Sequence, residues 1–202
     1  MFEKPAISDH DIHPLIARRW SGRAFDANRP VLREHLLQVL EAARWAPSCF
    51  NDQPWRFLVW DRHHDAVAWQ RAFMCLGEYN RTWAEPAPVL LAVCADTLLT
   101  TSGQPNRWGG YDAGAASMAL CVQATVLGLM VHQMGGFDAA KLAAEFAVPE
   151  RYTPMAMIAL GYQVSREQVP ASLHEKEFAA RSRRPLGASF FDGAWERPLG
   201  SG

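Results

Sequence analysis

The chain carries almost no net charge. Its 20 lysines and arginines face 21 aspartates and glutamates, so the formal net charge is −1 over 202 residues. Proteins that bind nucleic acid or an anionic membrane surface usually carry a clear excess of positive charge. The balance therefore argues against nucleic acid and against a membrane as partners. The chain also opens without a charged segment followed by an apolar run, so we expect no signal peptide.

Short motifs that mark several common enzyme classes are missing. The dinucleotide fingerprint GxGxxG, the phosphate loop GxxxxGK followed by serine or threonine, the nucleophile elbow GxSxG and the zinc motif HExxH do not occur. A function must therefore be sought in less familiar patterns.

Metal-binding and disulfide patterns are absent as well. The four cysteines are scattered without a CxxC pair, which is typical of reduced thiols in a cytoplasmic protein: Cys49, Cys75, Cys94 and Cys121. Two pairs of histidines lie in polar surroundings without a third ligand, and we interpret them as surface residues: His10 with His13, and His63 with His64. We expect no metal site.

One segment lacks charge altogether. From Ala113 to Phe137 there is no charged residue, a length that could span a bilayer. Polar residues and glycines interrupt it, and Gly128 falls where a helix would end. We therefore predict a helix of about 112–127 that is buried on most faces, followed by a strand. Such a helix needs more cover than one small domain offers, which is a first indication of a dimer.

What the chain does have is enough apolar material for one substantial core. Hydrophobic residues make up 49% of it, and 202 residues fit one domain with a polar tail from about 165. Asp138 is a predicted helix N-cap. The predicted helices cover residues 11–20, 30–46 (with Pro30 in the first turn), 65–77, 112–127 and 139–147, and the predicted strands cover 56–60, 88–96, 129–134 and 155–163. This irregular alternation predicts an α/β or α+β sheet layered between helices.

A connector of unusual composition joins the second predicted helix to the first strand. Residues 46–54 read APSCFNDQP, whereas a plain turn needs one proline and one asparagine or glycine. Two arginine groups lie near the ends of the chain: ARRWSGRAF (17–25) and RSRRP (181–185). Arginine suits phosphate or carboxylate, although each group alone is better explained as a solvated face. The GGFD turn (135–138) allows close backbone approach to a flat ligand, or is an ordinary turn.

Taken together, these pieces resemble the nitroreductase family of FMN enzymes. The resemblance covers nearly the whole chain, and six motifs in order carry it: RRWSGRAF, APSCFNDQPW, YNRTWAEPAPVLLAV, DAGAASMALCVQATVLGL, GGFD and RSRRPL. It implies an α+β fold of three α-β-α layers, with a central, mainly antiparallel sheet flanked by helices. It also implies a single domain over 1–202, with a C-terminal arm from about 165 to 202 exchanged with a homodimer partner.

The resemblance assigns a non-covalent FMN to named residues. Arg19, Trp20, Ser21 and Arg23 match the family's arginine–serine–arginine motif: Arg19 and Ser21 would hold phosphate and ribityl groups, and Arg23 the pyrimidine edge. A fixed cation at that edge favours the negative charge of reduced flavin. The other residues that the resemblance implies are Asn80 at the pyrimidine ring, Arg181 and Arg183 at the phosphate, and Met134, Gly135 and Gly136 beside flavin N5 and O4.

The resemblance also gives the connector a role. It implies that Pro47, Ser48, Cys49 and Asn51 line the FMN site of the other subunit, while Gln53 and Trp55 brace the turn. Cys49 stands where relatives carry serine, and we interpret it as a packing or weak hydrogen-bonding neighbour. Many relatives carry glutamate at the position of Gly135.

The implied activity is ping-pong hydride transfer through flavin N5, from NAD(P)H to a nitroaromatic, quinone or similar acceptor. No side chain need act as an acid or base, so no catalytic residue is named. Trp108 and Tyr111, in the predicted loop before the long helix, are candidates for the acceptor pocket or for interface packing. Alternatives are a dedicated reductase of a small carbonyl or enone, and a flavin-binding sensor or carrier without activity. Flavin-destroying and dehalogenating relatives carry lid insertions that are not found here.

Overall fold

A four-stranded antiparallel sheet forms the centre of the molecule. The computed structural model describes residues 2–199. Strands β1 (Trp55–Asp61), β2 (Val89–Asp96), β3 (Met130–Met134) and β4 (Tyr152–Gly161) are ordered β1-β2-β4-β3. Every residue of β2 is buried, as its continuous apolar run predicts for a strand covered on both faces.

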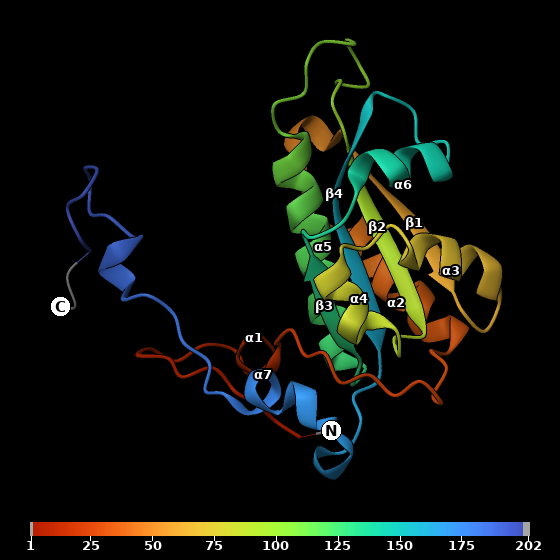
Figure 1. Cartoon of the computed structure of the whole chain (residues 1–202). Helices are drawn as coiled ribbons and strands as arrows, with labels where there is room; N and C mark the ends of the chain where they lie inside the picture. The colour runs from red at the N-terminus through yellow and green to blue at the C-terminus, as the bar shows by residue number, and fades with distance from the viewer. Residues whose placement is uncertain (1, 200–202) are drawn as a thin grey trace.

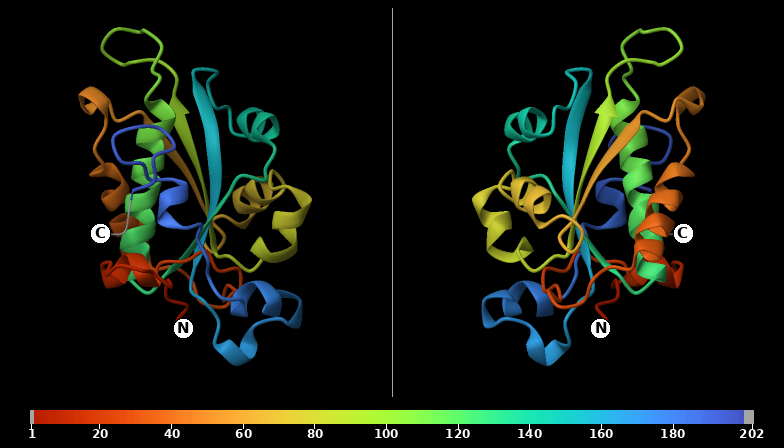
Figure 2. Two further views of the ribbon diagram at one scale, coloured as in Figure 1. Left: turned by 90° about the vertical axis from the view of Figure 1, so that its left-hand side faces the viewer. Right: turned by 90° about the vertical axis from the view of Figure 1, so that its right-hand side faces the viewer.

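Helices cover both faces of this sheet (Figure 1; Figure 2). Helices α2 (Arg33–Arg44) and α5 (Gly109–Val126) pack on one face, while α3 (Ala66–Phe73), α4 (Glu78–Ala84) and α6 (Ala139–Glu145) pack on the other. Each face of the sheet therefore has its own hydrophobic core. The predicted α+β class with three α-β-α layers is confirmed.

The charge-free segment is helix α5 followed by β3, as predicted. Gly128 has a φ of 70°, a left-handed conformation that glycine adopts without strain, and it ends the helix. Buried residues lie all around α5, among them Ala113, Leu120 and Cys121. Among the described residues, no helix combines the length and apolar character needed to cross a bilayer.

Several element predictions need correction, beginning with the first helix, which was predicted over 11–20 and covers only Pro14–Arg18. Helix 65–77 is shorter, because α3 ends at Phe73 and a separate helix, α4, follows the turn at Gly77. Pro30 lies outside α2, which begins only at Arg33. The last strand begins at Tyr152 rather than at 155, since pairing with β2 continues to that residue. The predicted N-cap is confirmed: the Asp138 side chain accepts a hydrogen bond from Lys141 N.

The N-terminal segment lies against residues 174–181 beside the sheet. The N-terminal segment carries α1 (Pro14–Arg18) and the C-terminal segment carries α7 (His174–Phe178). The rings of Phe2 and Phe178 are 5.6 Å apart, and Arg181 Nη1 donates to Lys4 O at 2.9 Å. Beyond this contact the chain leaves the body of the molecule (Figure 1). Four short 3-10 turns complete the structure: η1 (Cys49–Asn51), η2 (Arg166–Gln168), η3 (Ala171–Leu173) and η4 (Leu186–Ala188).

Candidate functional site

An open pocket of about 370 Å³ lies between the end of β3 and the start of α4. This volume falls within the range of ~300–1,000 Å³ that is usual for small-molecule sites. Four of the predicted cofactor residues line it together: Asn80, Met134, Gly135 and Gly136. The pocket also includes His132, which the sequence did not single out.

The glycine turn presents its backbone to this pocket. The Gly136 carbonyl accepts hydrogen bonds from Asn80 Nδ2 at 2.8 Å and from Gly77 N at 2.9 Å. Within residues 2–199, neither the Gly135 amide nor the Gly136 amide is bonded to an acceptor. A Cβ atom on Gly136 would come within 2.9 Å of Asn80 Nδ2, so a side chain here would displace the Asn80 amide. The rim therefore offers two N–H donors to a ligand.

Arg23 is linked to the same pocket by Trp83, whose ring contacts both Arg23 and the pocket residue His132. Its guanidinium carbon is 5.6 Å from the centre of the Trp83 ring, and the His132 ring is 4.4 Å from that ring. The Nε atom of Arg23 is buried and has no hydrogen-bond partner in the described part of the chain. A buried donor without a partner is costly, so a ligand oxygen at this point would relieve a penalty.

His132 is held as a neutral imidazole. Burial lowers its pKa to about 4, and the nearby Arg23 guanidinium adds to this effect. Its Nδ1 atom lies 3.1 Å from Gly22 O, and because a carbonyl only accepts, Nδ1 carries the proton. Glu177 is a second residue that the sequence did not reveal: its fully buried carboxylate accepts from Arg23 N at 2.8 Å.

Three of the predicted phosphate-binding arginines form one cationic cluster. The pKa of Arg181 is lowered by its burial and by the neighbouring charges of Arg19 and Arg183. Arg19 also donates a long hydrogen bond of 3.4 Å to Ser21 Oγ. No acidic side chain of residues 2–199 forms an ion pair with any of these three arginines. A cluster of unpaired cations of this kind is suited to an anion such as phosphate.

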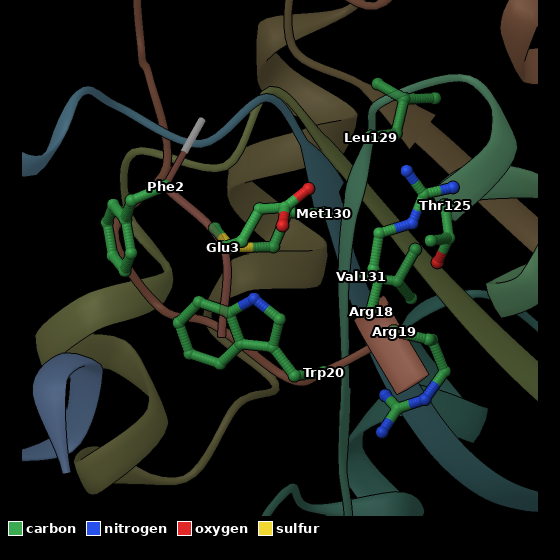
Figure 3. A pocket seen from close by; sticks show the side chains of 9 residues that line it. All are labelled: Phe2, Glu3, Arg18, Arg19, Trp20, Thr125, Leu129, Met130 and Val131. Atoms are coloured by element: carbon green, nitrogen blue, oxygen red, sulfur yellow. The ribbon is translucent and has the colours of Figure 1, made fainter. Parts of the chain in front are cut away.

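Trp20 lies in a second cavity, which its neighbours Arg18 and Arg19 also line. Its ring lines this cavity of about 110 Å³ with Phe2 and Met130 (Figure 3). It packs 5.9 Å from the Phe2 ring and 4.7 Å from Lys4 Nζ. Figure 3 shows the adjacent side chains of Arg18 and Arg19 leaving the chain in opposite directions. The Trp20 indole therefore packs against the N-terminal segment, in the cavity that Arg19 also lines, and its predicted role toward FMN stays a prediction.

The connector has a tightly specified backbone. Phe50, Asn51 and Gln53 have φ values of 54°, 55° and 50°, in the left-handed region that non-glycine residues seldom adopt. Ser48 Oγ accepts from Gln53 N at 3.0 Å, and Gln53 Nε2 donates to Asn51 O at 3.0 Å, so Gln53 braces the turn through its backbone and its side chain. Backbone strain of this kind is typical of functional segments, because surrounding contacts must hold it in place.

One of these contacts ties the connector to the long helix. Asp112, in the first turn of α5, is buried and accepts from Cys49 N at 3.0 Å. No local sequence pattern marks this role of Asp112, because 63 residues separate the two positions. The contact places Pro47, Ser48, Cys49 and Asn51 at the N-terminal end of α5.

The arginine segment lies at the other end of the same helix. Arg19 and Thr125 line one cavity, and Thr125 is in the last turn of α5. At 1.5 Å per residue, Asp112 and Thr125 are about 20 Å apart along the helix axis. Figure 1 and Figure 2 show the connector and the red N-terminal segment at opposite ends of α5. A single chain therefore does not bring the two halves of the predicted site together.

Trp108 and Tyr111 also need a correction. They were expected in the loop before the long helix, but α5 begins at Gly109, so Trp108 is its N-cap residue and Tyr111 lies within it. Trp108 is 38% exposed and Tyr111 is 78% exposed, on the same end of α5 as the connector.

A three-layer α+β domain with a cluster of arginines and a glycine-rimmed pocket offers donors that suit a flat, phosphorylated cofactor. The chain belongs to the Nitroreductase family, whose sequence profile matches residues 16–162.

Individual relatives agree with this assignment. A crystal structure of an oxidoreductase containing FMN is 36% identical, with a TM-score of 0.85 over 94% of this chain and 96% of that one. A protein from Desulfovibrio desulfuricans, provisionally named a nitroreductase and solved with FMN, is 25% identical with a TM-score of 0.68, covering 92% and 99% of the two chains. YdgI of Bacillus subtilis, provisionally named an NAD(P)H nitroreductase, is 27% identical over 77% of this chain and 90% of its own.

Proposed function

We propose that the protein is an FMN-dependent oxidoreductase that uses NAD(P)H to reduce nitroaromatic, quinone or similar acceptors in a ping-pong cycle. The observation that carries the proposal is the cluster of Arg19, Arg181 and Arg183, which has no acidic partner among the described residues. Two related structures contain FMN, and the name of a third relative describes NAD(P)H as the reductant.

The residues present fit FMN chemically. The arginine cluster and Ser21 supply donors for a phosphate and a ribityl chain. Asn80 Nδ2 is engaged by Gly136 O, so Asn80 Oδ1 is the atom that can accept from a ring N–H. The amides of Gly135 and Gly136 are free to donate to ring oxygen and nitrogen atoms, and the buried Arg23 Nε lacks an acceptor.

When bound, FMN supplies a ring that accepts a hydride from NAD(P)H and passes it to an oxidised acceptor. The chain's own part is to bind and orient. Arg23 would place a fixed positive charge where reduced flavin is negative, and the neutral His132 would add no charge of its own. No side chain is assigned the role of acid or base.

We further propose a homodimer in which the connector completes the flavin site of the partner. In one chain the connector and Arg19 lie at opposite ends of α5. A second copy of the chain is therefore the simplest source of a connector beside the arginines of the flavin site. Large apolar side chains on α2 and α5 support a partner on this side of the molecule: Leu37, Trp45, Tyr111, Met118 and Val126 are each more than a third exposed.

The C-terminal arm is the proposed exchanged element. Residues 186–199 leave the body of the molecule (Figure 1), and they carry Phe190 and Trp195 with 56% and 82% of their surface exposed. A single chain gains little from exposing aromatic rings, so a partner subunit is the natural place for them.

Colour provides the test of function. The purified protein should bind roughly one FMN per chain without a covalent bond and be yellow, and anaerobic NADH or NADPH should bleach it. Stopped-flow reduction with both nucleotides, followed by reoxidation with nitroaromatic, quinone and enone acceptors, would identify the reductant and the acceptor class. A protein that stays colourless after incubation with FMN contradicts the proposal. A yellow protein that neither nucleotide bleaches would instead be a flavin-binding module.

A further inference from the structure

One peptide group in the arginine segment is held from one side by a buried carboxylate and from the other by a partly buried imidazole. This group joins Gly22 to Arg23. Its carbonyl lies 3.1 Å from His132 Nδ1, and its N–H donates to Glu177 Oε1 at 2.8 Å. The two partners come from strand β3 and helix α7, 110 and 154 residues away along the chain.

The surroundings leave this peptide no freedom. Glu177 is fully buried, and a side chain at Gly22 would overlap the Sδ atom of Met130 and approach Glu177 Oε2 to 3.3 Å. Burial raises the pKa of Glu177, against the opposing effects of the Arg23 N–H and the Lys4 ammonium. Glu177 Oε2 has no hydrogen-bond partner in the described part of the chain. Burying a carboxylate costs free energy. The hydrogen bond from Arg23 N offsets part of this cost, which indicates that the carboxylate has a role at this peptide.

We propose that Glu177 and His132 form a clamp on the Gly22–Arg23 peptide that positions the Arg23 guanidinium, and that this clamp sets the preference of the site for reduced over oxidised FMN. The inference rests on the proposed function, because it concerns the flavin that Arg23 would face.

Two contacts connect the clamp to the guanidinium. The clamped peptide directly precedes the Arg23 Cα, so its orientation determines where the side chain starts. The guanidinium then lies over Trp83, and the same ring also packs against His132, 4.4 Å away. His132 thus holds both the backbone of Arg23 and the aromatic ring beside its charge. A positive charge fixed in this way acts on the flavin without a cost of reorganisation.

The clamp also links two parts of the cofactor site. Glu177 lies four residues before Arg181, which belongs to the cationic cluster and binds Lys4 O and Ala17 O. The C-terminal segment therefore fixes the phosphate end through Arg181 and the pyrimidine end through Glu177.

The test compares two neutral replacements of Glu177. Glu177→Gln and Glu177→Leu both remove the charge and have similar size, but only glutamine keeps an acceptor for Arg23 N. The affinities of oxidised and reduced FMN are measured for each holoprotein. We expect the leucine variant to lose roughly tenfold in its preference for reduced FMN relative to the glutamine variant, which equals ~30 mV for a two-electron couple. The matched control is Glu175, exposed on the same helix, where the glutamine and leucine variants should not differ.

His132 provides a second, independent pair. Asparagine can still donate to Gly22 O and leucine cannot, so His132→Leu should fall below His132→Asn in the same preference. In an Arg23→Ala background, the difference between Glu177→Gln and Glu177→Leu should disappear. A difference that persists without Arg23 would show that Glu177 acts by another route and would overturn the clamp.

Hydrogen exchange separates this inference from the proposed function. In the protein without FMN, the Arg23 amide should exchange slowly in the wild type and in Glu177→Gln, and at least tenfold faster in Glu177→Leu. If the protein binds no FMN, the proposed function fails, while this exchange result still reports on the clamp. An Arg23 amide that exchanges fast in the wild type, or equally in both variants, contradicts the inference.

Discussion

Arg23 is the residue whose charge bears most directly on the proposed flavin chemistry. Replacing it with alanine removes a cation from beside Trp83 and the pocket. Reduced flavin should then be less stable relative to oxidised flavin, and the reduction potential should fall by several tens of millivolts, since ~30 mV corresponds to about 1.4 kcal/mol. Spectroscopic titration of the holoprotein measures the potential.

The control for this prediction is Arg33→Ala, because Arg33 is an exposed arginine at the start of α2. Its removal should leave the potential unchanged. An unchanged or raised potential in Arg23→Ala would show that Arg23 does not face the flavin.

His132 should give the protein a characteristic loss of stability in acid. Its pKa in the folded state is about 4, below the value of about 6.5 for an unfolded chain, so the unfolded state takes up the proton first. The contribution of His132 is therefore fully present above pH ~6.5 and is lost as the pH falls towards ~4, by about 2–3 kcal/mol. His132→Asn removes this titration.

Urea unfolding of both proteins without FMN, between pH 7 and pH 4, measures this effect. The free energies of unfolding of wild type and His132→Asn should converge, or cross in favour of the variant, as the pH falls. A difference that stays constant over this range would mean that the imidazole is not held neutral.

At the residue scale, the sequence marks the motif residues more clearly than the residues that contact them. Arg19, Arg23 and the glycine turn belong to compact motifs, so the resemblance could locate them. Glu177 and His132 support them from positions more than a hundred residues away, and no local pattern marks such a contact. The predicted roles of the motif residues toward FMN remain predictions.

At the scale of the elements, an ion pair joins the last residue of β2, Asp96, to Arg151, which directly precedes β4. Asp96 also contacts the connector. Arg151 Nη2 lies 2.6 Å from Asp96 Oδ2, and the Asp96 side chain is only 1% exposed. Burial acts to raise the pKa of Asp96, but hydrogen bonds from Arg151 and from Leu98 N hold it below its usual value. Asp96 N also donates to Pro54 O, at the end of the connector.

Arg151→Met should therefore destabilise the protein by about 1–3 kcal/mol at pH 7, a range reduced because Arg151 is 41% exposed. Because the pKa of Asp96 is lowered in the folded state, its contribution is present above pH ~4 and is lost as the pH falls further. The difference from wild type should thus shrink below pH 4 in urea unfolding. The control is Arg197→Met, whose partner Asp192 is 59% exposed; it should cost less than about 0.5 kcal/mol. Equal losses in both variants would contradict this account.

Helices and strands with a clear local sequence pattern could be predicted, and those without one could not. β2 was clear from its continuous apolar run, and α6 from its N-cap at Asp138. α4 was missed because its seven residues show no clear apolar stripe, and only tertiary packing buries Trp83 and Ala84. α5 was predicted as a helix, but apolar residues on all its sides could not show which side faces the sheet.

At the scale of the whole molecule, the long helix α5 separates two half-sites. The arginine segment and the C-terminal segment meet at one end, and the connector is fastened to Asp112 at the other. A two-fold dimer that pairs each end with the opposite end of its partner would build two equal sites from four halves. The sequence could indicate this arrangement only through the family resemblance, because no pattern within one chain reports the position of a second copy.

Mixing two inactive variants tests this central claim most directly. One variant carries Arg19→Glu and Arg183→Glu, and the other carries Ser48→Trp and Asn51→Trp, so each homodimer should be inactive in NAD(P)H-dependent reduction. In a mixed dimer, one site collects both defects and the other collects none. Random mixing makes about half of the dimers mixed, so co-expression should restore roughly a quarter of the wild-type activity. Activity that stays at the level of the parents, in a sample proven to contain mixed dimers, would show that each site lies within a single chain.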